Sequence, residues 1–359
     1  MFSLLPEELD RYKQQIKLPS IGMDGQARLK QASVLCIGAG GLASPALLYL
    51  AAAGIGIIGI VDDDYVDLSN LQRQIIFRSE HAASAKAGSA KEQLENLNPH
   101  IKVNAYHERL TTQNVNQLIA AYDIIIDCSD NFSTRYLLND ACVRLNKPFV
   151  FGSVLEFEGQ CSSFFDNGLA CFNCLFPEAD MAKPGLNCNQ AGVLGVVPGV
   201  IGILQAAEVL KYLLNLGATL AGRLLTVNLL TMDFKAYTLQ KNPHCQICSH
   251  AQRQQRFEVT VPTITIDELK SQMTNDTGLD LLDVRTLAER SAGHLGGIWI
   301  PYAELKQRVH ELNPVKNWVI YCQSGVRSQY AADILLSSGF LSVKSLTGGM
   351  AAWRHCFKS

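Results

Sequence analysis

The sequence contains no cluster of lysine or arginine residues, and its charges almost balance. Lys and Arg total 31 against 33 Asp and Glu, which gives a net charge of −2. Because affinity for nucleic acids rests on clustered positive charge, this balance argues against a nucleic-acid-binding protein. Hydrophobic residues make up 48% of the chain and charged residues 18%, so we expect a large folded core rather than disorder.

The sequence also has no secretory signal and no uninterrupted membrane span. The first residues, MFSLLPEELDRYKQQ, show no basic stretch followed by an apolar one. Ser33–Val61 is uncharged, but its glycines fall into two groups, which predicts strand, turn, helix, turn and strand instead of one spanning helix. We therefore expect a cytoplasmic protein without membrane contact. In that compartment thiols stay reduced, so we interpret its eleven cysteines first as metal ligands, nucleophiles or core residues, and only after these as disulfide partners.

Two α/β segments divide the chain. Strands alternate with helices between Ser33 and Phe151, which indicates a parallel sheet covered by helices. Beyond residue 153 the alternating segment Val154–Phe165 and two later short strands indicate an antiparallel portion of the same domain. We predict a first domain at 1–250, a polar and mobile linker at 251–262, and a small α/β domain at 263–359.

A glycine loop follows the first predicted strand. Gly38, Gly40 and Gly41 open a helix, so the backbone can approach phosphate oxygens and the helix N-terminus can offer its free N–H groups. Asp62 ends the next strand, about twenty residues further on, where a carboxylate can bind ribose hydroxyls. The pattern predicts a nucleotide site. The alternative is a turn that only permits close packing of the helix.

The polar residues that follow favour a triphosphate over a nicotinamide. Arg73 and Lys86 would supply positive charge to phosphates, and Asp130, just after another strand, would hold Mg²⁺. The carboxyl ends of parallel strands converge on one crevice, so we expect these side chains to meet there. Taken singly, Arg73 and Lys86 also fit a solvated surface, and Asp130 fits the N-cap of a helix.

These motifs resemble a known family. GAGGLASPALLYLAAAGIGIIGIVDDDYVDLSNLQRQ and DCSDNFSTRY are similar to the adenylating MoeB/ThiF/HesA enzymes, relatives of ubiquitin-activating enzymes, over roughly residues 8–250. The resemblance implies a Rossmann-like, homodimeric enzyme that uses ATP and Mg²⁺ to join AMP to the C-terminal Gly-Gly end of a small β-grasp sulfur carrier. It also implies which residues bind ATP: Gly41, Asp62, Ser69, Asn70, Leu71, Gln72, Arg73, Lys86, Asp130 and Asn131.

The sequence departs from the family pattern at Gln14. The family has an arginine there, which reaches into the ATP site of the partner subunit, and the neighbouring Lys13 does not reproduce a guanidinium fork. An alternative interpretation is therefore a non-catalytic scaffold that only binds a β-grasp partner.

Two pairs of cysteines have the spacing of zinc ligands. Cys171 and Cys174 form one CxxC hook, and Cys245 and Cys248 form another. Four thiolates complete a closed tetrahedral Zn²⁺ site, whose role is structural. Two redox pairs are the alternative, while the family resemblance supports zinc. A fifth cysteine, Cys188, stands before an apolar helix, and the resemblance implies that it attacks the acyl-adenylate or receives sulfur.

The last domain carries a further cysteine in an anion-binding loop. Cys322 ends a buried strand and Arg327 follows at the fifth position, so loop amides and a helix N-terminus would surround the sulfur. Phosphatases use the same arrangement with a loop usually one residue longer. Together with LLDVR, GHL and GG, the loop resembles a rhodanese-type sulfurtransferase. This resemblance implies a persulfide on Cys322, Arg327 as an anion-holding group, and structural roles for Asp283 and His294.

Together the two resemblances predict adenylation of a carrier followed by sulfur delivery, as in molybdopterin-synthase sulfurylase fused to rhodanese. The sulfur donor is thiosulfate or a cysteine desulfurase. The pathway stays open among molybdenum cofactor, thiamine, cysteine and tRNA thiolation. A nicotinamide-dependent oxidoreductase on the same sheet is the less favoured enzyme.

Overall fold

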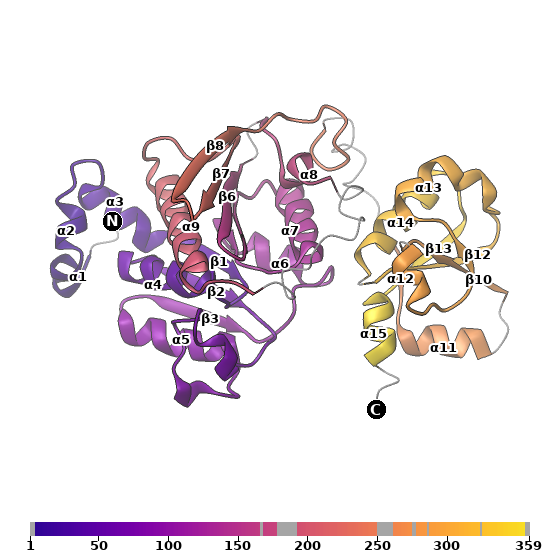
Figure 1. The fold of residues 1–359 in the computed structure, drawn as a ribbon, viewed down its shortest axis with the longest axis horizontal. Helices are drawn as coiled ribbons and strands as arrows, with labels where there is room; N and C mark the ends of the chain where they lie inside the picture. Colours follow the sequence, from indigo (N-terminus) through magenta and orange to yellow (C-terminus); the bar gives the residue numbers. More distant parts are fainter. Residues whose placement is uncertain are drawn as a thin grey trace. The chain divides into compact units, whose positions relative to one another are not determined.

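The computed structural model describes residues 4–165, 168–177, 192–249, 261–274, 278–285, 287–323 and 325–355. The described residues of 4–176 and 192–249 form one compact unit, and those from 261 onward form a second. Each unit is built around its own sheet (Figure 1). The predicted linker lies largely outside the described residues, so its mobility and the domain limits stay predictions.

An eight-stranded sheet organises the first unit. Its order is β3-β2-β1-β4-β5-β6-β7-β8, and the first five strands in that order run parallel. The last three continue the sheet in antiparallel fashion, as the alternating pattern after residue 153 predicts. The strands are β1 (Ser33–Ile37), β2 (Ile57–Val61), β3 (Lys102–Tyr106), β4 (Ile124–Asp127), β5 (Phe149–Leu155), β6 (Glu158–Phe164), β7 (Arg223–Asn228) and β8 (Asp233–Thr238).

Helices cover both faces of the parallel strands. Alternate side chains of β1, β2 and β4 enter two separate cores, because successive residues of a strand point to opposite faces. One core packs against α4, α5 and α9, and the other against α6 and α7. The helices are α1 (Pro6–Arg11), α2 (Lys13–Ile16), α3 (Gly22–Gln31), α4 (Ala43–Ala53), α5 (Lys86–Leu97), α6 (Val115–Ala120), α7 (Phe132–Leu145), α8 (Phe172–Leu175) and α9 (Val196–Leu214).

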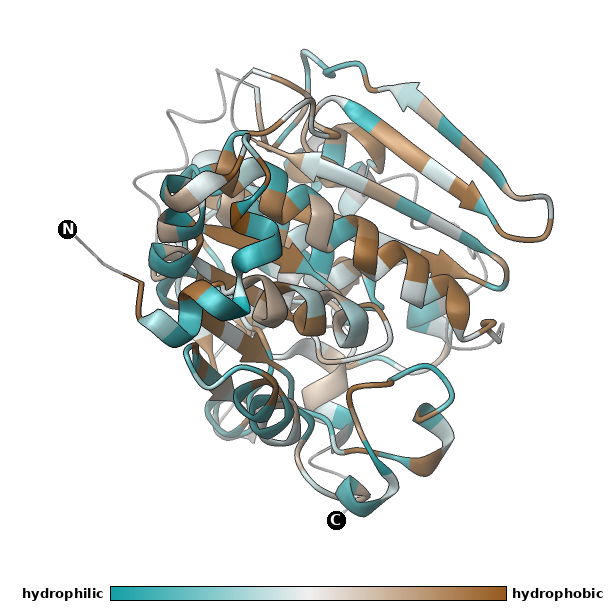
Figure 2. Cartoon of the chain, turned by 90° about the vertical axis from the view of Figure 1, so that its left-hand side faces the viewer, coloured by the Kyte–Doolittle hydropathy of each residue, from teal (hydrophilic) through white to brown (hydrophobic). Residues whose placement is uncertain are grey.

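The uncharged segment Ser33–Val61 folds as β1, α4 and β2, as predicted. One described helix, α9, is long and apolar enough to cross a membrane by length and composition. It packs against α4, β5 and β6, and Ile201 and Val209 are fully buried in the core. We therefore interpret α9 as a core helix. Figure 2 shows the contrast between the largely hydrophilic N-terminal helices, next to the label N, and the hydrophobic elements behind them.

The second unit holds a five-stranded parallel sheet in the order β11-β10-β12-β13-β9. Two apolar clusters, one on each face, confirm the small α/β fold expected here. Its elements are β9 (Thr263–Ile264), α11 (Ile266–Thr274), β10 (Leu279–Asp283), α12 (Leu287–Ser291), β11 (Ile298–Trp299), α13 (Tyr302–Arg308), β12 (Asn317–Tyr321), α14 (Val326–Ser337), β13 (Ser342–Leu346) and α15 (Gly349–His355).

Candidate functional sites

A cleft lies at the carboxyl ends of the parallel strands of the first unit. This is the edge where open α/β sheets bind their ligands. Eight of the residues predicted for a nucleotide site line this cleft: Gly38, Gly40, Gly41, Asp62, Arg73, Lys86, Asp130 and Asn131.

The glycine loop fits closely against two strand ends. Gly38 has a φ of +89°, and a Cβ placed there would lie 2.9 Å from the carbonyl oxygen of Cys128, at the end of β4. The backbone N–H of Ala39 donates a hydrogen bond of 2.6 Å to the Asp62 carboxylate at the end of β2. The loop is therefore fixed in position by both neighbouring strands.

Asp62 combines burial with backbone hydrogen bonds. Loss of solvent raises the pKa of its carboxyl above the ordinary value, although the N–H groups of Ala39 and Asp64 act in the opposite direction. A carboxylate at the end of the second strand is suited to ribose hydroxyls, as the sequence predicts.

Lys86 is a buried cation at the first turn of α5. Lys86 is only 5% exposed, and its Nζ lies 2.9 Å from Asp64 Oδ2. Its backbone N–H also donates to the carbonyl of Asp64. The interpretation of Lys86 as a solvated surface residue is wrong, because its side chain is packed into the cleft wall.

The two residues Asp130 and Asn131, which follow β4, have different surroundings. Asn131 caps α7 by accepting a 2.9 Å hydrogen bond from the Thr134 N–H, whereas Asp130 is exposed in the cleft. Interpreting Asp130 as the N-cap is therefore wrong. Beneath them, buried Arg135 donates to the Ser129 carbonyl at 2.8 Å and pairs with Asp127 at 3.7 Å. Burial raises the pKa of the Asp127 carboxyl.

Two groups of residues differ from the prediction. Ser69, Asn70, Leu71 and Gln72 are not among the residues that line the cleft, so their contact with ATP stays a prediction. Sequence reasoning missed Arg109 as a cleft residue. Its Nε lies 3.2 Å from Asp63, and its place just after β3 could have revealed it by the strand-end rule. Gln14 and Lys13 are exposed on α2.

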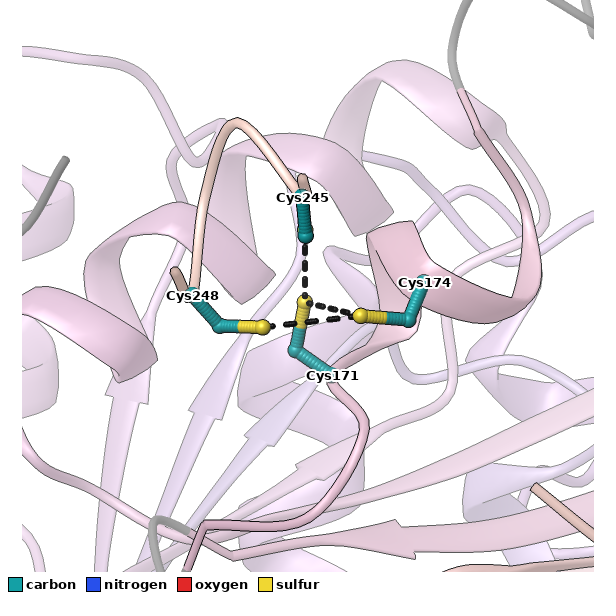
Figure 3. Close-up of side chains that lie close together, drawn as sticks. All are labelled: Cys171, Cys174, Cys245 and Cys248. Atoms are coloured by element: carbon teal, nitrogen blue, oxygen red, sulfur yellow. Dashed lines mark hydrogen bonds between the residues drawn. The ribbon is translucent and has the colours of Figure 1, made fainter. Parts of the chain in front are cut away.

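The four predicted metal ligands come together (Figure 3). Their sulfur atoms all lie within 4.8 Å of one another. The separations are 3.9 Å for Cys171–Cys174, 3.7 Å for Cys171–Cys245 and 3.5 Å for Cys174–Cys248. A tetrahedral zinc–thiolate site with bonds of about 2.3 Å needs sulfur atoms about 3.8 Å apart, so the geometry fits zinc.

Neighbouring polar groups support the sulfur cluster. The amides of Asn139 and Asn173 lie 3.8 Å and 3.6 Å from the sulfur atoms of Cys171 and Cys245. The Ile247 N–H approaches Cys245 at 3.5 Å. N–H groups of this kind stabilise thiolates around a metal. Cys36, Cys128, Cys142 and Cys161 are instead buried in the core. Cys188 lies outside the described residues.

Cys322 lies at the end of β12 in the second unit and is fully buried. The N–H of Gly325 donates to its sulfur at 3.1 Å. Gly325 has a φ of +91°, and a Cβ at Gly349 would lie 2.4 Å from the Cys322 carbonyl oxygen. These contacts form a close backbone cradle around Cys322, in which the Gly325 N–H faces the sulfur. Asp283 accepts hydrogen bonds from Arg285 at 2.8 and 2.9 Å.

Arg327 lies in the first turn of α14, where the resemblance implies an anion-holding group. Its Nη1 and Nη2 donate hydrogen bonds of 2.9 and 2.5 Å to the two carboxylate oxygens of Glu289 on α12. No sequence motif links Glu289 to Arg327, since the two residues are 38 positions apart.

Each of the two units matches a known protein family. Residues 12–247 match the ThiF family model, and residues 265–356 match the rhodanese-like domain model. The chain is 47% identical to the sulfur carrier protein adenylyltransferase of Thermus thermophilus, over 67% of this chain and 91% of that protein. It is 39% identical to the probable adenylyltransferase/sulfurtransferase MoeZ of Mycobacterium tuberculosis, over 98% of this chain and 94% of that protein.

A solved structure shares the fold of the first unit. The crystal structure of E. coli MccB with MccA-N7isoASN has a TM-score of 0.59 and 19% identity. The match covers 67% of this chain and 75% of that one.

Proposed function

The chain belongs to the ThiF family and carries a rhodanese-like domain, and on this premise we propose that it adenylates a sulfur carrier and then delivers sulfur to it. The carrier is a small β-grasp protein with a C-terminal Gly-Gly. The observation that supports this most strongly is the cleft itself, in which a glycine loop, the carboxylate of Asp62 and several cations, Lys86 and Arg73 among them, converge. Near-full-length similarity to an adenylyltransferase/sulfurtransferase supports the second step.

The first step joins the carrier's terminal carboxylate to the α-phosphorus of ATP and releases pyrophosphate. Gly38, Gly40 and Gly41 would hold the phosphates, and Asp62 the ribose. Lys86 and Arg73 would stabilise charge on the phosphates. Asp130, as an exposed carboxylate in the cleft, would bind Mg²⁺, which neutralises the triphosphate. The product is a mixed anhydride with AMP as its leaving group.

The second step uses Cys322. A persulfide on its sulfur attacks the carrier's carbonyl carbon, and AMP leaves. Releasing the thiocarboxylate from the resulting acyl disulfide needs a second thiolate, which would form a disulfide with Cys322. An external thiol can supply this thiolate, whereas for Cys188 the family resemblance implies attack on the acyl-adenylate or acceptance of sulfur. The persulfide comes from thiosulfate or a cysteine desulfurase, and the backbone cradle around Cys322 supports an anionic sulfur.

Zinc would fill the cluster of Cys171, Cys174, Cys245 and Cys248 and join the segments that carry the two hooks. We further propose a homodimer in the cytoplasm, where thiols such as Cys322 stay reduced. Molybdenum cofactor biosynthesis is supported by the similarity to the probable molybdopterin-synthase adenylyltransferase of Porphyra purpurea. Thiamine synthesis and tRNA thiolation are the further pathways that the same chemistry would serve.

ATP–pyrophosphate exchange tests the adenylation step. The full chain is incubated with Mg·ATP, labelled pyrophosphate and a carrier that ends in Gly-Gly. We expect exchange that depends on the carrier and disappears when its last glycine is deleted. Exchange without any carrier, or none with all candidate carriers, would contradict the proposal, and the latter result would favour the scaffold interpretation raised by Gln14.

A further inference from the structure

The anion-holding arginine of the second unit is already bound by a carboxylate of the same chain. Glu289 meets Arg327 with both oxygens, at 2.9 and 2.5 Å. Their side chains are 28% and 19% exposed, so the pair is shielded from much of the solvent. A bidentate carboxylate–guanidinium pair of this kind is among the stronger polar contacts in proteins.

Glu289 is held in place by a second, fully buried arginine. Arg285 Nη1 donates a 3.0 Å hydrogen bond to the backbone carbonyl of Glu289. The same guanidinium is bound to Asp283, and both side chains are 0% exposed. The carboxylate therefore reaches Arg327 from a fixed backbone.

From this geometry we infer that Glu289 is a specificity-determining residue, which disfavours dianionic donors that release sulfite, such as thiosulfate, and favours thiol persulfides. The inference rests on the proposed sulfur-carrying role of Cys322. Glu289 neutralises Arg327 and occupies two of its donors, so an incoming dianion must compete with a carboxylate that is already bound.

Thiosulfate and a thiol persulfide depend on the guanidinium of Arg327 to different degrees. With thiosulfate, the Cys322 thiolate forms a bond to the outer sulfur, the S–S bond breaks, and its electron pair leaves on sulfite. With a thiol persulfide, the same attack on the terminal sulfur releases a thiolate. Both transfers balance without an oxidant or reductant. Sulfite carries two negative charges and depends more on a free guanidinium than a thiolate does.

Loading of Cys322 in the full chain tests the inference. The protein is mixed with thiosulfate or with cysteine persulfide, quenched by alkylation, and analysed by mass spectrometry to give a loading rate for each donor. We expect Glu289→Gln to raise the second-order rate with thiosulfate roughly tenfold or more, the size of one charged hydrogen bond. The rate with cysteine persulfide should change less than about threefold, well under that charged-bond effect.

Matched variants complete the test. Glu289→Asp keeps the charge and should keep thiosulfate slow. Glu304→Gln removes an exposed carboxylate of α13 that pairs with Arg308 and should leave both rates unchanged. A normal rate of Cys322 loading with cysteine persulfide also shows that the domain of the variant is folded. An unchanged or lower thiosulfate rate in Glu289→Gln, with normal persulfide loading, would overturn this inference alone. If neither donor loads Cys322 in the wild type, the proposed function fails as well.

Discussion

The carboxylate of Asp62 accepts a hydrogen bond of 2.6 Å from the backbone N–H of Ala39. This bond joins the end of β2 to the glycine loop that follows β1. It fixes the proposed ribose-binding carboxylate against the proposed phosphate-binding loop before any nucleotide enters. Nucleotide affinity should therefore depend on the oxygen atoms of this side chain.

Asp62→Asn should weaken binding of a non-hydrolysable ATP analogue by about tenfold or more, because the amide offers one acceptor oxygen in place of two. Isothermal titration calorimetry measures the affinity. Asp233→Asn, at an exposed position of β8, is the control and should bind as the wild type does. Equal affinity in Asp62→Asn would place the ribose elsewhere.

The stability of the same variant should depend on pH in a defined direction. Burial raises the folded-state pKa of Asp62, so its contribution to stability is present at low pH and is lost as pH rises through that pKa. Relative to the wild type, Asp62→Asn should gain stability as the pH rises above about 4, the ordinary pKa of an aspartate. Urea unfolding at several pH values checks this. A relative loss over the same range would show that hydrogen bonding, and not burial, dominates.

Lys86→Met should lower the rate of carrier adenylation about a hundredfold, the usual effect of removing one preorganised charged donor. Lys91→Met, on the same helix but in an exposed pair with Glu95, should keep the rate within about twofold, since exposed pairs contribute little. Pyrophosphate release, measured by a coupled assay, compares the two. Similar rates for both variants would argue against a direct role of Lys86.

The purified protein should contain one zinc ion per chain, bound by the sulfur cluster. Cys171→Ser should lose the metal and lower the melting temperature, because the remaining thiolates cannot close the tetrahedron. Metal analysis and calorimetry measure both effects. Cys142→Ala provides the contrast: it removes a buried core thiol and should lower stability while the zinc remains. Full zinc content in Cys171→Ser would refute the assignment.

Most of the fold could be predicted because the local patterns are strong. Most parallel strands that begin between Ser33 and Phe151 are short apolar runs, such as Ser33–Ile37 and Ile57–Val61, and the structure has the predicted alternation of strands and helices there. The start of α5 was harder to place, because Ser79–His81 forms a separate 3₁₀ turn and the α-helix begins only at Lys86. Lys86 therefore lies at a helix N-terminus rather than within the helix.

The contacts that define the sites were less predictable. Lys86 and Asp64 are 22 residues apart, and Glu289 and Arg327 are 38 apart. No periodicity links such positions, because the folded sheet alone brings them together. The four metal ligands are an exception, since CxxC spacing carries its own geometric constraint. Asp62 and Asp130 could be predicted because each closely follows a parallel strand, and the carboxyl ends of such strands meet at the ligand cleft. Arg109 also follows a parallel strand closely, so the same rule could have predicted it.

Intact-mass spectrometry of the carrier tests the central claim most directly. The full chain is incubated with a Gly-Gly carrier and Mg·ATP, and a sulfur donor is then added. The account predicts a carrier that first gains AMP and then has one oxygen replaced by sulfur; Cys322→Ala should stop the reaction after the first product. A carrier that never gains AMP, or one that gains sulfur equally well with Cys322→Ala, would contradict the account.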